Sequence, residues 1–458
     1  MARYAGQAAR GLVVDDTLRI GVTGLARAGK TAFLTSAAAN LLAWGAGRAA
    51  LPALGPAGRV GVSIAPARAS ALPRFDVARH RAALAADPPD WPARTNAASL
   101  MALDFVIPRQ SFGVSLPLHR LRVELLDYPG EWLLDLPLLQ MSFQNWSTST
   151  LARLHNLHGA AAAVAQDFLA FSAGLPAGAA ADEALVAAGH GLYRTMLTRL
   201  RDEQHLALLQ PGRFLMPAPG DAPPWIAFFP HSGAGNLTAL LSERYDAYVA
   251  AAREDLAEPM FGNLDRIVVL ADLLTALHAG AAAFRDTQAA LAAVSSALRW
   301  RATWLDSVLA LGQGRWPPRA ITRVAYAATK ADHVASRQRG NLAALMRDLV
   351  RDPAEPLLGA DVPAGHFAIA AVRCTEDVVW QLDGHPVSAV RGRRIGDAAP
   401  GRSYPGEVPD RVPDASFWQH PFLDLPVFEP LRLPDQGRGG VPSVALDELL
   451  AFILADVL

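Results

Sequence analysis

From Gly24 to Thr31 the chain reads G-L-A-R-A-G-K-T, and the spacing of its glycines and lysine is that of a phosphate-binding loop. In such a loop, backbone N–H groups surround the phosphates, the lysine reaches the β and γ oxygens, and the final hydroxyl binds Mg²⁺. The apolar run Leu18–Val22 predicts a strand before the loop, and Thr31–Trp44 predicts a helix whose N-terminus faces the anion. We therefore predict that Lys30 acts in catalysis, that Thr31 is a Mg²⁺ ligand, and that the phosphates are held by Gly24, Ala26, Arg27, Ala28, Gly29, Lys30, Thr31 and Ala32.

Lysine occurs at only two positions, Lys30 and Lys330, although lysine and arginine together number 42. Nearly all positively charged side chains in this chain are therefore arginines. Lysine is a compact ammonium on a slim stem, whereas arginine is a broad planar fork. The two lysines consequently indicate positions at which the arginine shape would not serve.

The second lysine lies in the run T-K-A-D, which follows the apolar run Val324–Ala328. This is the place of the N/T-K-x-D element of GTPases. The carboxylate of Asp332 can accept two hydrogen bonds from the N1 and N2 donors of guanine, and adenine offers no such pair of donors. After the predicted strand His366–Ala370, a last loop can offer an amide to guanine O6. The predicted base-binding residues are Thr329, Lys330, Asp332, His333, Ala371, Val372 and Arg373.

Between these two motifs, the apolar strand Arg122–Leu126 ends in D-Y-P-G, a D-x-x-G element. We predict that Asp127 binds Mg²⁺ and that the amide of Gly130 senses the γ-phosphate. Glu131 follows directly, at a position from which it could orient the attacking water. The alternative for Glu131 is an acid of a helix first turn, favoured by the helix dipole.

The segment Trp91–Asn96 precedes the strand predicted at Leu100–Val106, where a first switch loop is expected. We predict that Trp91 and Thr95 contact the nucleotide and that Thr95 also binds Mg²⁺. The negative charge on the transferring phosphoryl oxygens requires neutralisation, and an arginine can supply it. Arg27 and Arg94 are the candidates. The alternative for Arg27 is a side chain that points to solvent or pairs with a surface carboxylate.

Strands and helices alternate along the chain, which predicts a doubly wound α/β sheet. The P-loop domain begins at 1–145 and resumes at 263–458, with strands at Ile267–Ala271, Val324–Ala328 and His366–Ala370. Residues 146–262 read as helices (147–171, 182–209 and 236–256) and predict an inserted all-helical domain. The Pro/Gly/Arg-rich segment 384–441 predicts a surface wrap or mobile loop rather than a packed layer. Other helices are expected at 281–311, 341–350 and 444–458.

Bulk composition excludes several classes of protein. The net charge is −1, so the basic excess of a nucleic-acid-binding protein is missing. A lone cysteine, Cys374, allows no internal disulfide and fits a reducing compartment. No apolar run approaches the roughly 18 residues of a membrane-spanning helix, and the N-terminus does not resemble a signal peptide. We therefore expect a cytoplasmic protein.

The run D-Y-P-G-E-W-L-L-D-L-P at 127–137 resembles the YcjX-like family of bacterial stress-associated GTPases, which is linked to the phage-shock response. The runs at 21–24 and 328–334, and Phe417-Trp418 with the C-terminal helix, are similar too. The resemblance implies a Ras-like GTP-binding domain with a helical domain. Ala26 and Ala28 depart from it, because small polar residues are expected there. The P-loop is also similar to that of guanylate-binding proteins, which implies an internal arginine finger at Arg27. Arg94 resembles the cis arginine of heterotrimeric G-protein α subunits.

Together these features predict a Mg²⁺-dependent GTPase that binds GTP and GDP, turns over slowly without a protein partner and can form oligomers. Two alternatives remain open. One is an ATPase of the same fold, as older names for the family have it. The other is a nucleotide-gated scaffold with negligible hydrolysis.

Overall fold

The computed structural model describes residues 16–66, 72–93, 98–111, 114–176, 178–216, 227–254, 264–309, 321–351, 362–420, 424–433, 438–454 and 456–458. Side chains are described throughout these ranges except at 109–111, 114–117 and 297–309. Two predicted site residues, Arg94 and Thr95, lie outside the described residues. Within the described part of the chain, no helix is long and apolar enough to cross a membrane.

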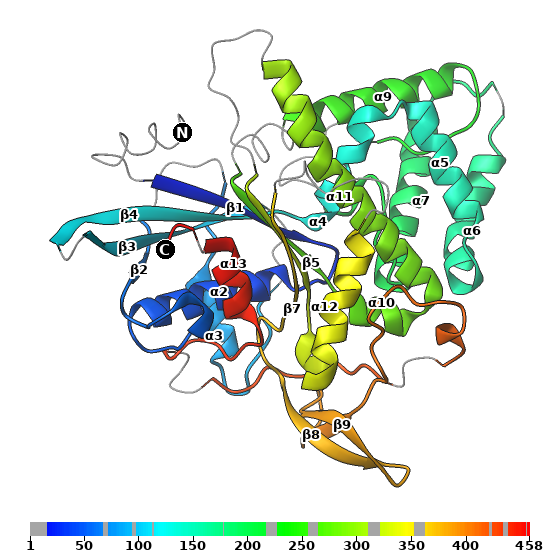
Figure 1. Ribbon diagram of the computed structural model, residues 1–458. Coiled ribbons are helices and arrows are strands. Elements are labelled where there is room, and N and C mark those ends of the chain that lie inside the picture. Colours follow the sequence, from blue (N-terminus) through cyan, green and yellow to red (C-terminus); the bar gives the residue numbers. More distant parts are fainter. Residues whose placement is uncertain are drawn as a thin grey trace.

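A seven-stranded sheet forms the centre of the molecule, in the order β2-β3-β4-β1-β5-β6-β7 (Figure 1). The strands from β4 to β7 in this order are parallel, and β2 and β3 are antiparallel to their neighbours. Every apolar run predicted as a strand forms one. The sequence did not reveal β2, whose residues are mostly exposed. The strands are β1 (Asp16–Gly24), β2 (Gly61–Ile64), β3 (Ser99–Ser111), β4 (Val114–Asp127), β5 (Arg266–Ala271), β6 (Arg323–Ala328) and β7 (Ala364–Ala368).

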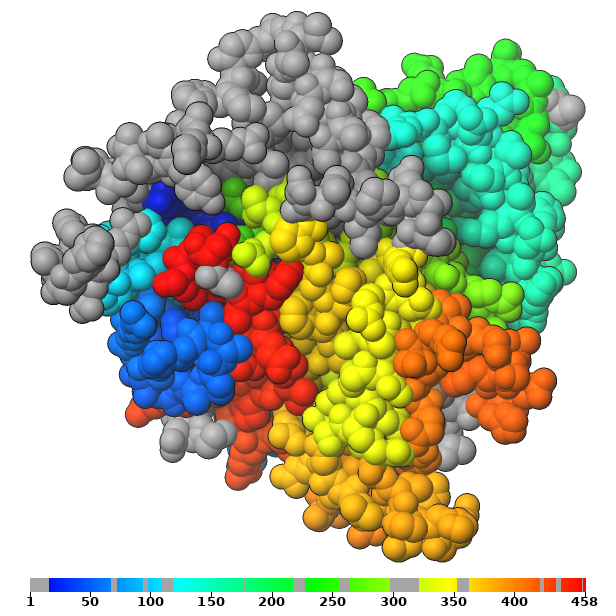
Figure 2. Space-filling view, in the orientation of Figure 1, coloured from blue at the N-terminus to red at the C-terminus, as the bar shows by residue number. Residues whose placement is uncertain are grey.

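Helices cover both faces of this sheet, as the alternating side chains of β5 demonstrate. Ile267 and Val269 pack into one core with α10 (Leu273–Ala279), α11 (Ala281–Leu309) and α12 (Ser336–Val350). Val268 and Leu270 pack into a second core with α2 (Lys30–Gly45), α3 (Val77–Leu84) and α13 (Leu446–Leu454). Strands buried on both faces need continuous apolar runs, which explains why the sequence revealed them. The C-terminal end of the chain, in red, lies on the surface beside the N-terminal elements in blue (Figure 2).

The helices between β4 and β5 pack around an aromatic core of their own, which includes Trp146, Tyr193, Phe228 and Tyr245. They lie together to one side of the sheet (Figure 1). The prediction of a single helix at 147–171 is wrong, because the helix is interrupted. Asn156 is the C-cap of α5, and the next helix begins at Gly159, which has a φ of +58°. The helices are α4 (Gly130–Leu133), α5 (Phe143–His155), α6 (Gly159–Ala173), α7 (Glu183–Asp202), α8 (Gly212–Leu215) and α9 (Asn236–Ala252).

The interpretation of 384–441 as a loop or wrap is wrong for its first part. β8 (Thr375–Leu382), β9 (His385–Gly392) and β10 (Gly401–Ser403) form a three-stranded antiparallel sheet. Leu382 pairs with His385, and the two residues between them, Asp383 and Gly384, have φ values of +48° and +80°. An Asp-Gly pair in this conformation is the favoured two-residue hairpin turn, and that signal was present in the sequence.

Candidate nucleotide-binding site

A cavity of about 850 Å³ lies outside the carboxyl ends of β1, β4 and β6. This is the edge at which open α/β sheets bind ligands. Gly24, Gly130 and Arg373 do not line the cavity. The predicted residues that do line it are Ala26, Arg27, Ala28, Gly29, Lys30, Thr31, Ala32, Trp91, Asp127, Glu131, Thr329, Lys330, Asp332, His333, Ala371 and Val372.

The start of α2 has the features of an anion site. Its N-cap is Gly29, with a φ of +78°; as a glycine it provides no side-chain cap, and no acid stands in the first turn. A Cβ atom on Gly29 would meet nothing within 4 Å. The start of α2, with the positive end of the helix dipole, lies at the wall of the cavity, which suits a phosphate. The Lys30 ammonium donates to the Gly24 carbonyl at 3.1 Å and so lies along the same loop.

Two glycines allow close backbone approaches, one between the D-x-x-G element and the phosphate loop and one between that loop and β5. A Cβ on Gly130 would lie 1.5 Å from the carbonyl oxygen of Gly24, and a Cβ on Gly24 would lie 2.5 Å from that of Leu270. Neither position tolerates a side chain unless backbone moves. Parallel pairing of β1 with β4 sets Asp127 beside Val22. The carboxylate of Asp127 and the hydroxyl of Thr31 thus come to one cavity, and both are oxygen ligands of the kind that Mg²⁺ prefers.

At the other end of the cavity, Asp332 is 1 % exposed and already holds hydrogen bonds. Its carboxylate accepts from the Cys374 N–H at 2.6 Å and the Cys374 thiol at 3.0 Å, and lies 3.3 Å from His333 Nδ1. Burial alone would raise the pKa of Asp332, but these contacts outweigh it and hold the pKa below its usual value. An ionised carboxylate with two oxygens keeps further acceptor capacity for a base. These bonds join the T-K-A-D loop to the loop after β7.

Arg373 does not take the predicted place at the base. Its backbone N–H donates to the Pro442 carbonyl at 2.7 Å, and its side chain donates to the Thr375 carbonyl and pairs with Asp377. Ala371 and Val372 keep their places on the cavity wall. Trp91 also lines the wall, and its indole N–H donates to the Phe428 carbonyl at 2.8 Å.

Lys330 pairs with an acid that sequence reasoning missed. The backbone of Lys330 has a φ of +59°, and its ammonium forms an ion pair with Asp272. The same ammonium donates to the hydroxyl of Thr275 at 3.4 Å. Asp272 caps α10 by accepting from the Thr275 N–H at 3.0 Å. Burial opposes ionisation of Asp272, but the charge of Lys330 and the hydrogen bonds with Lys330 and Thr275 together outweigh it and hold the pKa of Asp272 below its usual value. A signal existed, because an acid directly follows the fully buried strand β5.

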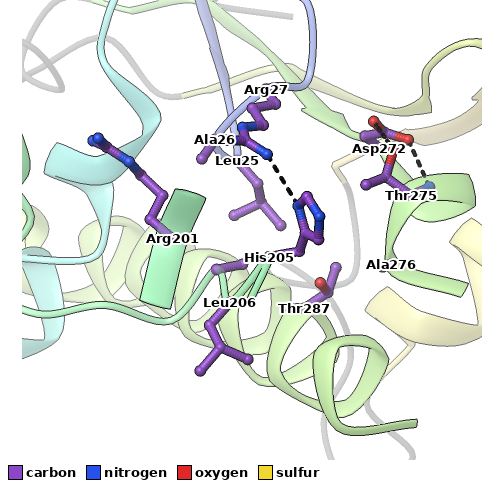
Figure 3. Close-up of a pocket in the computed structure, with 11 residues that line it drawn as sticks. Leu25, Ala26, Arg27, Arg201, His205, Leu206, Asp272, Thr275, Ala276 and Thr287 are labelled. Carbon is purple, nitrogen blue, oxygen red and sulfur yellow. Dashed lines mark hydrogen bonds between the residues drawn. The ribbon is translucent and has the colours of Figure 1, made fainter. Parts of the chain in front are cut away.

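The helices between β4 and β5 supply another wall that the sequence did not indicate. Arg201 and Asp202, at the end of α7, and His205, just after it, line the cavity together with Leu215 and Met216. Arg27 forms an ion pair with Asp202 at 3.1 Å and a hydrogen bond with His205 Nδ1 at 3.0 Å. The predicted alternative for Arg27, pairing with a carboxylate, is therefore what the structure has. A small pocket of about 40 Å³ adjoins this contact (Figure 3).

A mixed sheet that is mostly parallel, with a glycine-rich loop between β1 and α2, fits the class of P-loop nucleoside triphosphatases. Within that class the chain belongs to the YcjX-like family (DUF463), whose model matches residues 18–458. It is 33% identical over 470 residues to the Ras-like GTPase YcjX of Escherichia coli (strain K12), covering 97% of each chain. It is 30% identical over 479 residues to the Ras-like GTPase YcjX of Shewanella oneidensis, covering 97% of this chain and 95% of that one. The predicted family is confirmed, and the names of these relatives support a GTPase-type function.

Proposed function

We propose that this protein binds GTP with Mg²⁺ and hydrolyses it to GDP and phosphate, as a cytoplasmic, stress-related molecular switch. One observation carries the proposal. A phosphate loop, an acid after β4 and a T-K-x-D acid after β6 come from distant parts of the chain and line one cavity. The relatives' names add support for guanine as the base.

In this proposal each residue has a distinct task. Lys30 and the backbone amides at the start of α2 hold the β and γ phosphates. Asp332 accepts from guanine, while the backbone amide of Ala371 or Val372 donates to guanine O6. Thr31, Asp127 and Thr95 hold Mg²⁺, which neutralises phosphate charge when bound. Glu131 orients the attacking water, the Gly130 amide senses the γ-phosphate, and Arg27 or Arg94 stabilises the charge that develops during transfer.

The helices of 146–262 serve, in this proposal, as an inserted domain between the two parts of the P-loop domain, 1–145 and 263–458. The aromatic core that they share supports this division. Since residues after α7 and in α8 line the cavity, the arrangement of these helices is expected to respond to the nucleotide. An unknown protein partner would then read that response, and a pull-down with GTP-loaded and GDP-loaded protein can isolate it.

The test is equilibrium competition for labelled GDP by GTP and ATP, followed by phosphate release over many turnovers with and without Mg²⁺. We expect GTP to compete, ATP to compete at least about a hundredfold more weakly, and release to require Mg²⁺. Equal competition by ATP would favour an ATPase of this fold. Tight GTP binding without turnover would favour a nucleotide-gated scaffold.

A further inference from the structure

The side chain of Arg27 leaves the phosphate loop and reaches the end of helix α7 (Figure 3). Its backbone has a φ of +63°, which is uncommon for a residue with a side chain. One nitrogen of the guanidinium donates to both the carbonyl oxygen and the carboxylate of Asp202, each at 3.1 Å. The other terminal nitrogen lies 3.0 Å from His205 Nδ1. The loop expected to hold the phosphates is therefore bound directly to the inserted helices.

His205 must be neutral in this contact. Arginine can only donate, so Nδ1 of His205 has to accept, and the ring proton lies on Nε2. Burial and the neighbouring charge of Arg27 both lower the pKa of His205, which agrees with this assignment. His205 also has a positive φ, +56°, so both ends of the contact have an uncommon backbone conformation.

The contact is arranged so that Arg27 can leave it at small cost. Asp202 is also held by Arg201 through two further hydrogen bonds, at 3.0 and 3.1 Å, and would not be left without a cation. His205 is neutral and would lose no charge partner. The side chains of Arg27 and Asp202 are 30 % and 38 % exposed, and ion pairs this open to water contribute little stability.

Arg27 and His205 line both the large cavity and the small pocket beside it. The guanidinium therefore lies at the edge of the space expected to hold the triphosphate. A triphosphate carries several negative charges, whereas Asp202 carries one that it already shares with Arg201. A bound GTP would compete for Arg27 more strongly than GDP, because GTP has the additional γ-phosphate.

We propose that Asp202 and His205 are positioning residues that hold Arg27 away from the phosphates and release it when GTP is bound. The end of α7 thereby limits hydrolysis and reports the nucleotide state to the inserted helices. This inference rests on the proposed function, with Arg27 as the arginine that stabilises charge on the γ-phosphate.

The first test uses the nucleotide-free protein and hydrogen exchange at the end of α7, where the amides of Glu203 and Leu206 donate to Arg199 and Leu200. Arg27→Ala should speed hydrogen exchange of these amides about threefold or more. In the wild type, a GTP analogue with a non-hydrolysable γ-phosphate should speed their exchange by a similar factor, and GDP should not. Glu203→Gln is the matched control, because Glu203 pairs with Arg199 and not with Arg27.

The second test is single-turnover GTP hydrolysis. Asp202→Asn and His205→Ala should each raise the rate about threefold or more, and should have no effect when Arg27→Ala is also present. Arg27→Ala alone should lower the rate about a hundredfold. If the wild type hydrolyses GTP normally but both Asp202→Asn and His205→Ala have unchanged or lower rates, Asp202 and His205 do not hold Arg27 back. The proposed GTPase function would stand in that case. Failure of the wild type to bind GTP would overturn the proposed function and this inference together.

Discussion

The carboxylate of Asp135 accepts a hydrogen bond from the backbone N–H of Gly212 at 2.6 Å, which joins the segment after the D-x-x-G element to helix α8. Asp135 also accepts from the Arg213 N–H at 3.2 Å and from the Tyr248 hydroxyl at 2.5 Å, and it is fully buried. A Cβ on Gly212 would lie 1.8 Å from the Glu131 carbonyl oxygen, so the two backbones touch. The D-Y-P-G-E-W-L-L-D-L-P run is thus an interface between the candidate nucleotide site and the helices between β4 and β5.

Asp135 should make stability depend on pH. Burial raises its pKa to about 6 from a reference value of 3.8, against the pull of its hydrogen bonds. Because the pKa of Asp135 is higher in the folded than in the unfolded protein, Asp135 adds most to the free energy of unfolding below its unfolded pKa. That contribution is lost as pH rises through the folded pKa, by about 3 kcal/mol at neutral pH. Asp135→Asn should remove this dependence.

Urea unfolding between about pH 4 and pH 7 measures the effect. The amide of Asp135→Asn offers one oxygen to three donors, so its absolute stability should fall below that of the wild type at acid pH. Its decline with rising pH should nevertheless be shallower. Asp246→Asn, at an exposed position of α9, is the control and should keep the slope of the wild type. If the unfolding free energy of Asp135→Asn fell with pH as steeply as that of the wild type, the expectation that Asp135 titrates in this range would be wrong.

Gly130→Ala should disturb both the fold and the nucleotide site. The added methyl would occupy the position 1.5 Å from the Gly24 carbonyl, so backbone has to move in the phosphate loop. We expect a loss of about 1–3 kcal/mol in unfolding free energy and a weakened affinity for GTP and GDP.

The control for this substitution is Gly191→Ala, in the middle of α7, where a Cβ would meet nothing within 4 Å. Alanine is the better helix former, so this variant should gain about 0.5–1 kcal/mol. If Gly130→Ala were as stable as the wild type and bound GTP equally well, the close approach of Gly130 to Gly24 would be wrong.

Asp332→Asn should shift base preference from guanine to xanthine, whose C2 carries an oxygen in place of an amino group. Loss of the charged acceptor should cost about 1.5–3 kcal/mol of GTP binding. Competition by GTP and xanthosine triphosphate against a labelled analogue measures this. Cys374→Ser is informative beside it, because serine keeps a donor toward Asp332 and should preserve GTP preference. Unchanged GTP affinity in Asp332→Asn would contradict guanine reading by this residue.

Glu131→Gln should slow single-turnover hydrolysis by about a hundredfold, the usual scale of a lost general base, without a matching loss of GTP affinity. Glu131 lines the cavity from the first turn of α4. Hydrolysis at the wild-type rate would leave Glu131 as an acid that favours the start of a helix. That outcome would direct the search for the water-orienting group elsewhere in the cavity.

Local sequence determined the elements that are proposed to hold the phosphates. The strand β1, the phosphate loop and α2 are contiguous, and each is encoded by short-range patterns: an apolar run, a glycine-lysine spacing and a helical stretch. The apolar stripe of α13, with Leu446, Leu449 and Ile453 buried, was likewise readable from periodicity. The most specific part of the family resemblance is also one contiguous run, 127–137. Each of these signals is complete within a few turns of chain.

Only the tertiary structure decided which distant side chains meet. Asp332 is bound by Cys374, 42 residues further along, and Arg27 by Asp202, 175 residues away. Such pairs leave no periodic pattern in the sequence, because it is the packing of other helices and strands that brings the two residues together. The same holds for Lys330 and Asp272, where an acid after a buried strand was visible but its partner was not. Sequence alone therefore predicted the candidate phosphate loop, because its signals are local. Packing of distant elements decided which side chains that loop contacts.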